Sequence, residues 1–152
     1  MEGRGIKRYL EIGVSTGGLI QFFHDTFAWE CFGADLRAPT GIAPGFGKGE
    51  GIRLFIGDSQ SVNFRLFMNS TVSQADLVWI DADHSYRSIE SDYRNALMLL
   101  PKLIAFHDIC GLRMCDGAAE HWNELKQENP GKTIEFIHDD PNTGCGIGVL
   151  IL

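Results

Sequence analysis

The chain has 152 residues, 44% of them hydrophobic, and a formal net charge of −7 at pH 7. This composition is typical of one soluble globular domain, which we expect to span residues 1–152. The acidic balance argues against a nucleic-acid partner, and no apolar run is long enough to span a membrane. The start of the chain lacks a signal-peptide core and the four cysteines form no C-x-x-C pair, so we predict a cytoplasmic protein with reduced thiols.

The first patterned stretch runs from Tyr9 to Ile20. It begins with apolar residues, passes an acid and a turn of small residues, and returns to apolar residues. This pattern predicts a buried strand, a tight turn and the first turn of a helix. Glycines such as Gly13 and Gly17 let a backbone approach a ligand closely, and a helix N-terminus favours polar or anionic groups. Ser15 occupies the second glycine position of the dinucleotide fingerprint, so that motif is incomplete.

The rest of the chain predicts alternating strands and helices, and so an α/β sheet of parallel strands. Residues 38–51 are rich in glycine and predict an exposed loop, and 139–144 predict a turn. Because only this turn separates the last two strands, they must form an antiparallel hairpin. On the third helix, Ile89, Tyr93, Ala96, Leu97 and Leu100 should share the buried face. The predicted strands are 9–12, 31–35, 52–58, 76–81, 103–108, 133–138 and 147–152, and the predicted helices are 19–27, 62–68, 85–100 and 118–128.

Each of the first five predicted strands ends in a polar residue after an apolar run. In a doubly wound sheet, ligands bind beyond the carboxyl ends of the parallel strands. The sequence therefore predicts one crevice into which several acids point. The residues at these ends are Glu11, Asp35, Asp58, Asp81 and the pair His107-Asp108.

Each of these acids also has a structural alternative. Asp58 could cap the following helix, and Asp35 could be a solvated turn residue. Asp35 nevertheless follows the glycine turn by roughly 20 residues, the spacing at which an acid meets a ribose hydroxyl. Asp81 and Asp108 lie too far before the next predicted helices to be caps, which favours a functional role.

Two histidines stand beside these last two aspartates. His84 and His107 could be packing residues, but their acidic neighbours favour function. A metal cluster of His107 with Cys110 and Cys115 is a weaker alternative. We interpret the other histidines, His24, His121 and His138, as structural. We interpret Tyr93 and Trp122 as residues of the core or its rim.

Four segments together resemble the class I S-adenosylmethionine-dependent methyltransferases. They are Glu11–Gly18, Gly57–Ser59, Ile80–Tyr86 and Phe106–Asp108. The segment Ile80–Tyr86 matches the IDxDHSY pattern of small-molecule O-methyltransferases, and the resemblance extends to 122–126 and 146–150. It implies a Rossmann-like, doubly wound, seven-stranded mixed sheet, in which the C-terminal hairpin supplies the antiparallel strand.

The resemblance also implies a site for S-adenosylmethionine (SAM) along the strand ends. The implied positions are Gly13, Ser15 and Gly17 beneath the methionine part, Glu11 facing its amine, Asp35 at the ribose hydroxyls, and Asp58 with Ser59 beside the adenine.

In relatives that bind a divalent cation, the ligands correspond to Asp81 and Asp108. His107 stands where those relatives often have an acid, and it is the third candidate ligand of the metal site. His84 matches the position of a general base in metal-dependent sugar O-methyltransferases. Paired carboxylates suit Mg²⁺ or Mn²⁺ better than zinc.

These observations predict a SAM-dependent methyltransferase that transfers a methyl group to a hydroxyl of a small-molecule acceptor. The alternatives are a non-catalytic module that binds the adenosyl cofactor and, less favoured, an NAD-dependent enzyme. The first predicted strand begins near Arg8, so we expect the chain to lack the upstream helices that often cover the substrate in such enzymes. We therefore expect the loop 39–51, or a second subunit in a homodimer, to close the site. The alternative is that the chain is a reduced version with little activity.

Overall fold

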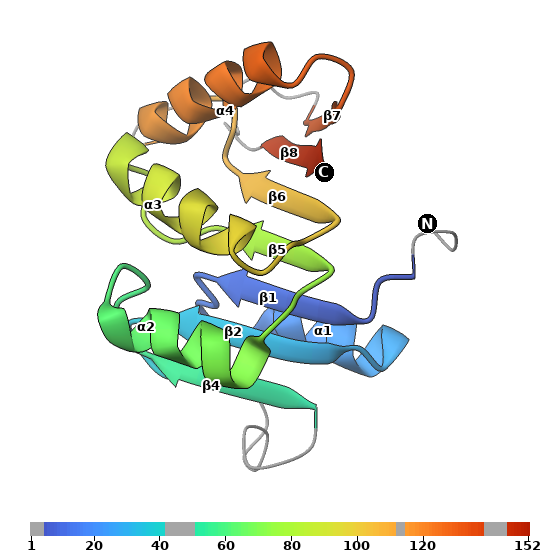
Figure 1. Ribbon diagram of the computed structural model, residues 1–152, viewed down its shortest axis with the longest axis vertical. Coiled ribbons are helices and arrows are strands. Elements are labelled where there is room, and N and C mark those ends of the chain that lie inside the picture. The colour runs from blue at the N-terminus through green and yellow to red at the C-terminus, as the bar shows by residue number, and fades with distance from the viewer. Residues whose placement is uncertain (1–4, 42–50, 112–114, 139–145) are drawn as a thin grey trace.

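The computed structural model describes residues 5–41, 51–111, 115–138 and 146–152. In these residues, seven strands form a single sheet of order β4-β2-β1-β5-β6-β8-β7 (Figure 1). The strands are β1 (Arg8–Ile12), β2 (Glu30–Asp35), β4 (Ile52–Ile56), β5 (Leu77–Ile80), β6 (Leu103–His107), β7 (Thr133–Ile137) and β8 (Gly146–Ile151). The helices are α1 (Gly18–Phe27), α2 (Val62–Phe67), the π-helical turn η1 (Met68–Val72), α3 (Tyr86–Leu97) and α4 (Asp116–Glu128).

The sheet confirms the predicted fold class. Strands β4, β2, β1, β5 and β6 are parallel, and β8 is antiparallel to both β6 and β7. The chain builds outward from β1 to β2 and β4, and then crosses back to β5 on the other side of β1. This reversal between β1 and β5 is the switch point, where the carboxyl ends of neighbouring strands leave a crevice.

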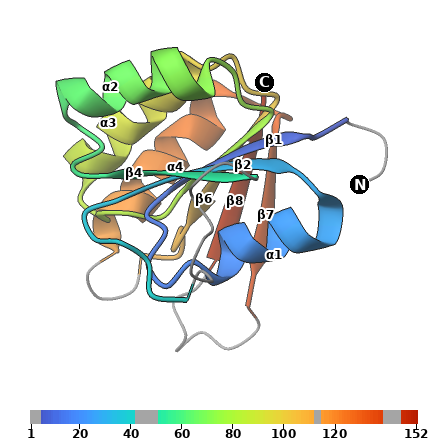
Figure 2. The same ribbon diagram turned by 90° about the horizontal axis from the view of Figure 1, so that it is seen from below.

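Helices cover the two faces of the sheet unequally. Figure 2 shows α2, α3 and α4 on one face and α1 on the other. The larger core lies under α2, α3 and α4 and includes the fully buried Phe64, Ile104 and Trp122. Beneath α1, a smaller cluster surrounds Tyr9 and Ile20.

The α1 face of the sheet is only partly covered in the described part of the chain. Strand register places apolar side chains of β5, β6, β8 and β7 on this face. Apart from Ala105 they are half-buried or exposed, whereas the residues of β5, β6 and β8 on the opposite face are buried, as expected for alternation along a strand. They include Trp79, Leu103, Val149, Ile134 and Phe136.

One predicted core position is wrong. Leu100 is 78% exposed, and the buried residue near it is Leu99. The helix α3 ends at Leu97, because Pro101 disfavours the α conformation at the preceding residue, and Leu100 takes a positive φ of 51°. The expected helical spacing therefore stops before it reaches Leu100.

The other predicted elements agree with the structure within a few residues. α4 begins at Asp116 rather than Ala118, and η1 extends the predicted helix 62–68 to Val72. Trp122 is buried as expected, and Tyr93 packs against the core. Most of the predicted loop 38–51 and turn 139–144 lie outside the described residues. In the described ranges, no helix combines the length and apolarity needed to cross a membrane.

Candidate functional site

The turn between β1 and α1 is fixed by backbone conformation. Gly13 and Gly17 have φ values of +95° and +91°, and Ser15 also has a positive φ. A Cβ on Gly13 would lie 2.1 Å from the Asp81 carbonyl oxygen, so β1 and the end of β5 meet here without room for a side chain. Gly17 is the N-cap of α1. The predicted strand–turn–helix unit is therefore present, and its glycines are required by geometry.

A cavity of about 890 Å³ opens at this end of the sheet. This volume lies within the usual range for small-molecule sites. The walls come from the ends of β1, β2, β4 and β5 and from the segments that follow them. Five of the seven residues that the sequence implied for the cofactor line it, namely Gly13, Ser15, Asp35, Asp58 and Ser59.

Glu11 is not part of the wall of this cavity. Its side chain is on the α1 face of β1 and is 3% exposed. Burial raises the pKa of Glu11 from 4.5 to about 8, against smaller opposing effects of Tyr9 and the Ile20 backbone. Gly17 is likewise outside the cavity wall and acts at the start of α1. Their implied contacts with the cofactor remain predictions.

Asp35 and Asp58 both hold backbone N–H groups at the cavity. The carboxylate of Asp35 accepts hydrogen bonds from Ser15 N at 2.7 Å and Arg37 N at 2.9 Å. Asp58 accepts from Gln60 N at 2.8 Å. The N-cap of α2 is Ser61, whose hydroxyl accepts from Phe64 N, so the cap role considered for Asp58 is wrong. Asp58 instead shapes the turn before the cap.

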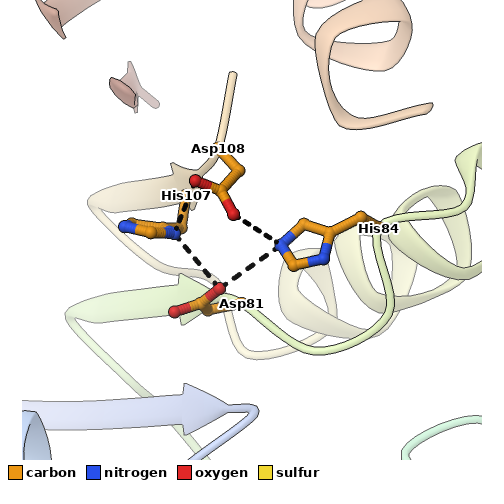
Figure 3. A group of neighbouring side chains, drawn as sticks. All are labelled: Asp81, His84, His107 and Asp108. Atoms are coloured by element: carbon orange, nitrogen blue, oxygen red, sulfur yellow. Dashed lines mark ion pairs between the residues drawn. The ribbon is translucent and has the colours of Figure 1, made fainter. Parts of the chain in front are cut away.

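Next to the cavity, the ends of β5 and β6 bring together Asp81, His84, His107 and Asp108 (Figure 3). One ligand atom from each lies within 4.8 Å of the other three. Nε2 of His84 is 3.5 Å from Asp81 Oδ1 and 3.2 Å from Asp108 Oδ2. Nδ1 of His107 is 3.3 Å from Asp81 Oδ1 and 3.2 Å from Asp108 Oδ1. The predicted approach of Asp81 and Asp108 from neighbouring strands is confirmed.

The chemistry of this cluster fits a divalent cation. His84 Nε2 and His107 Nδ1 are buried atoms without a hydrogen-bond partner, although each faces two carboxylates. Such nitrogen atoms have lone pairs available for a metal ion or a proton. The interaction with the neighbouring Asp81 carboxylate raises the pKa of His107 above its usual 6.5.

The cysteine alternative receives no support from the described cysteines. No cysteine sulfur belongs to the described group of converging ligand atoms. The thiol of Cys115 donates to Asp108 Oδ2 at 3.5 Å, from outside that group. The structure thus favours an oxygen and nitrogen ligand set.

Asp81 is common to the cavity and the cluster. It follows β5, and its backbone N–H donates to Ile12 O, which holds this end of β5 against the glycine turn. A molecule bound in the cavity would therefore extend toward the cluster of titratable side chains.

Sequence reasoning missed several cavity residues. Arg37 and Gln60 stand in loops where no pattern marks them. Thr16 and Asp83 belong to the segments Glu11–Gly18 and Ile80–Tyr86 but had no role assigned. Asp92 is the least obvious, because it lies within α3 and is only 1% exposed. The sequence held one signal for Asp92, its helical spacing from the polar residues Ser88 and Asn95. Such a polar stripe can face a loop as well as solvent.

No protein-family model matches the sequence, and no curated protein matches it significantly. Solved structures do match in fold. The O-methyltransferase TomG from Streptomyces achromogenes, in complex with SAM, superposes with a TM-score of 0.68 at 14% identity, over 97% of this chain and 74% of TomG. An O-methyltransferase from Bacillus cereus in complex with S-adenosylhomocysteine (SAH) gives 0.66 at 13% identity, over 98% and 76% of the two chains.

A third structure also contains a metal ion. MycE methyltransferase of the mycinamycin biosynthetic pathway, in complex with Mg, SAH and mycinamycin VI, has a TM-score of 0.67 at 14% identity. The match covers 99% of this chain but only 46% of MycE, so the chain spans less than half of that protein. At these identities the likeness concerns the fold. The chain has the Rossmann-like fold of the class I SAM-dependent methyltransferases.

Proposed function

We propose that this chain binds SAM in the cavity and transfers its methyl group to a hydroxyl oxygen of a small-molecule acceptor, assisted by a divalent cation. The observation that carries the proposal is the position of Asp81, which belongs both to the cavity and to the four-residue cluster. A cofactor site and an acid–base or metal site are thereby adjacent. The SAM- and SAH-bound structures with the same fold support the choice of cofactor.

The charge of the cavity supports SAM over a dinucleotide. Five aspartates and one arginine line it, which gives a formal charge of −4 when all are ionised. This environment attracts a sulfonium cation and repels the pyrophosphate of NAD. The aspartates are Asp35, Asp58, Asp81, Asp83 and Asp92, and the arginine is Arg37.

Within the cluster, we assign Asp81, His107 and Asp108 to the cation. Bound there, a divalent ion would supply a Lewis acid that lowers the pKa of an acceptor hydroxyl. Because one ligand is an imidazole nitrogen, Mn²⁺ suits this set better than Mg²⁺, which prefers oxygen ligands. Three protein ligands would leave positions open for an acceptor.

We assign His84 to proton transfer. It lies on the segment between β5 and α3, and its Nε2 has no hydrogen-bond donor that would occupy the lone pair. Nε2 takes the proton from the acceptor hydroxyl while the oxygen attacks the methyl carbon. The carbon–sulfur bond breaks, its electron pair remains on sulfur, and the products are SAH and a methyl ether. His84 then releases the proton to water.

The test combines binding with turnover. Calorimetry should detect SAH binding, Mn²⁺ binding should be seen by its electron paramagnetic resonance signal, and methyl transfer should be measured over a panel of hydroxylated acceptors. We expect His84→Ala to lower turnover by a factor of about 10² to 10⁴ while SAH and Mn²⁺ affinities stay nearly unchanged. Asp108→Asn should weaken Mn²⁺ binding and spare SAH binding. His24→Ala, a histidine change in α1, is the control.

Each part of the proposal has its own contrary result. Absence of SAH binding would refute the cofactor, and SAH binding without turnover on any acceptor would favour a non-catalytic module. Full activity in a chelator would refute the cation. If His84→Ala lost Mn²⁺ binding together with activity, His84 would be a fourth ligand and not the base.

A further inference from the structure

Helix α3 buries a stripe of polar residues. Ser88, Asp92 and Asn95 are 7%, 1% and 5% exposed, and their spacing places them on one face of the helix. This face packs against the segment Asp58–Gln60, which follows β4 and lines the cavity. Burying polar groups is costly unless each finds a partner, so the stripe requires an explanation.

Two members of the stripe hold this segment in place. Asn95 Nδ2 donates to Ser59 O at 3.0 Å, and Gln60 Nε2 donates to Ser88 Oγ at 2.8 Å. The hydroxyl of Ser88 donates onward to Asp83 Oδ2 at 3.1 Å. Ser88 and Asn95 are therefore satisfied, and together they fix the cavity wall on this side.

The third member, Asp92, is not satisfied. Its Oδ1 is buried without a hydrogen-bond partner, although its side chain interacts with Ser59. The residue is part of the cavity wall. Burial, with smaller contributions from the nearby Asp58 and Asp83, raises the pKa of Asp92 from 3.8 to about 6, against the opposing effect of the Ser59 hydrogen bond. A ligand in the cavity that brings a hydrogen-bond donor to Oδ1 would satisfy this buried acceptor.

The arrangement of the sheet indicates which part of the cofactor this donor belongs to. The cluster at the ends of β5 and β6 must lie near the transferred methyl group. Asp92 instead adjoins the segment after β4, which is separated from β5 by β2 and β1. In SAM the adenine is the group farthest from the methionine carboxylate, on the other side of the sulfonium. Its exocyclic amino group is a hydrogen-bond donor.

On the basis of the proposed SAM site, we propose that Asp92 accepts a hydrogen bond from the exocyclic amino group of the adenine and so selects adenine over 6-oxopurines. A 6-oxopurine presents a carbonyl oxygen in place of the amino group. That oxygen would face the carboxylate without a proton between them, and both acceptors would be left unpaired.

The experiment compares SAH with S-inosylhomocysteine, in which a 6-oxo group replaces the 6-amino group, by calorimetry. The wild-type chain should bind SAH at least about 10-fold more tightly, because a site built for a donor rejects an analogue that lacks it. Asp92→Asn is nearly isosteric and can donate to a carbonyl, so its preference should fall below about 3-fold. Asp25→Asn, the same change at an exposed position on α1, should keep the wild-type ratio.

Equal affinities for the two nucleosides in the wild-type chain would overturn the inference, as would an unchanged preference in Asp92→Asn. Neither outcome affects the proposed function, which fails only if SAH itself does not bind. If Asp92→Asn did not fold, NMR of the wild-type complex with SAH labelled with ¹⁵N at the adenine amino group would test the hydrogen bond instead. A hydrogen-bonded amino group gives two resolved proton signals, and a single averaged signal would contradict the proposal.

Discussion

Replacing Gly13 by alanine tests whether the glycine turn positions the whole site. The added Cβ would lie 2.1 Å from Asp81 O, 2.4 Å from Asp81 C and 2.7 Å from Ala82 N, all backbone atoms. These atoms cannot move aside as a flexible side chain would, so the end of β5 must shift. The positive φ of +95° adds about 1 to 2 kcal/mol for an L-residue, and overpacking adds about 1 to 3 kcal/mol. We therefore expect a loss of about 2 to 5 kcal/mol in the free energy of unfolding.

Because Asp81 is displaced, the same variant should also bind both SAH and Mn²⁺ more weakly. Urea unfolding gives the change in stability, and calorimetry gives the two affinities. Gly18→Ala is the matched control, since a Cβ there meets nothing within 4 Å and alanine favours the first turn of α1. A Gly13→Ala variant as stable as the Gly18→Ala variant, with unchanged affinities, would refute the role assigned to the turn.

Three further predictions concern binding, pH and assembly. Asp35→Ala should weaken SAH binding by about 10-fold or more in calorimetry, because it removes an acceptor that also binds the Ser15 backbone N–H. An unchanged affinity would show that Asp35 is not part of the SAH site. The free energy of unfolding should fall as pH rises from about 4.5 to about 8, because buried Glu11 stays protonated in the folded state and ionises on unfolding. In urea titrations, Glu11→Gln should flatten this pH dependence. We also propose that the half-covered α1 face of the sheet drives self-association into a homodimer. Light scattering should show the mass of a dimer, and Phe136→Ser should reduce this mass. A monomer mass at every concentration would refute the proposed homodimer.

Local patterns were sufficient to predict the strands of the sheet and three of the acids that line the cavity. Each parallel strand is a short apolar run that ends in a polar residue, and parallel strands place such ends at one edge. The convergence of Asp35, Asp58 and Asp81 on one cavity follows from this alone. The hairpin followed from its short connection. The insertion of β8 between β6 and β7 did not, because strand order depends on long-range packing that no local pattern records.

The parts that escaped prediction depend on contacts distant in sequence. Asp92 lies in a helix whose polar positions are normally solvated, and only the packing of α3 against Asp58–Gln60 buries it. Glu11 has a strand-end position like the other acids, yet its side chain points to the α1 face, and α1 covers it. The side of the sheet that a strand-end residue occupies decides whether it meets a ligand or a helix.

The acidic cavity leads to a final prediction about ionic strength. SAM carries a sulfonium charge that SAH has lost, and otherwise the two molecules present the same groups to the wall. With five aspartates against Arg37, the cavity should attract SAM through a Coulomb contribution that SAH lacks. Salt screens this contribution, since the Debye length falls from roughly 10 Å at 0.1 M to roughly 3 Å at 1 M. Raising NaCl over this range should therefore weaken SAM binding several-fold more than SAH binding in parallel calorimetric titrations, and Asp58→Asn should reduce the difference. Equal salt dependence for the two ligands would show that the carboxylates do not act on the sulfonium.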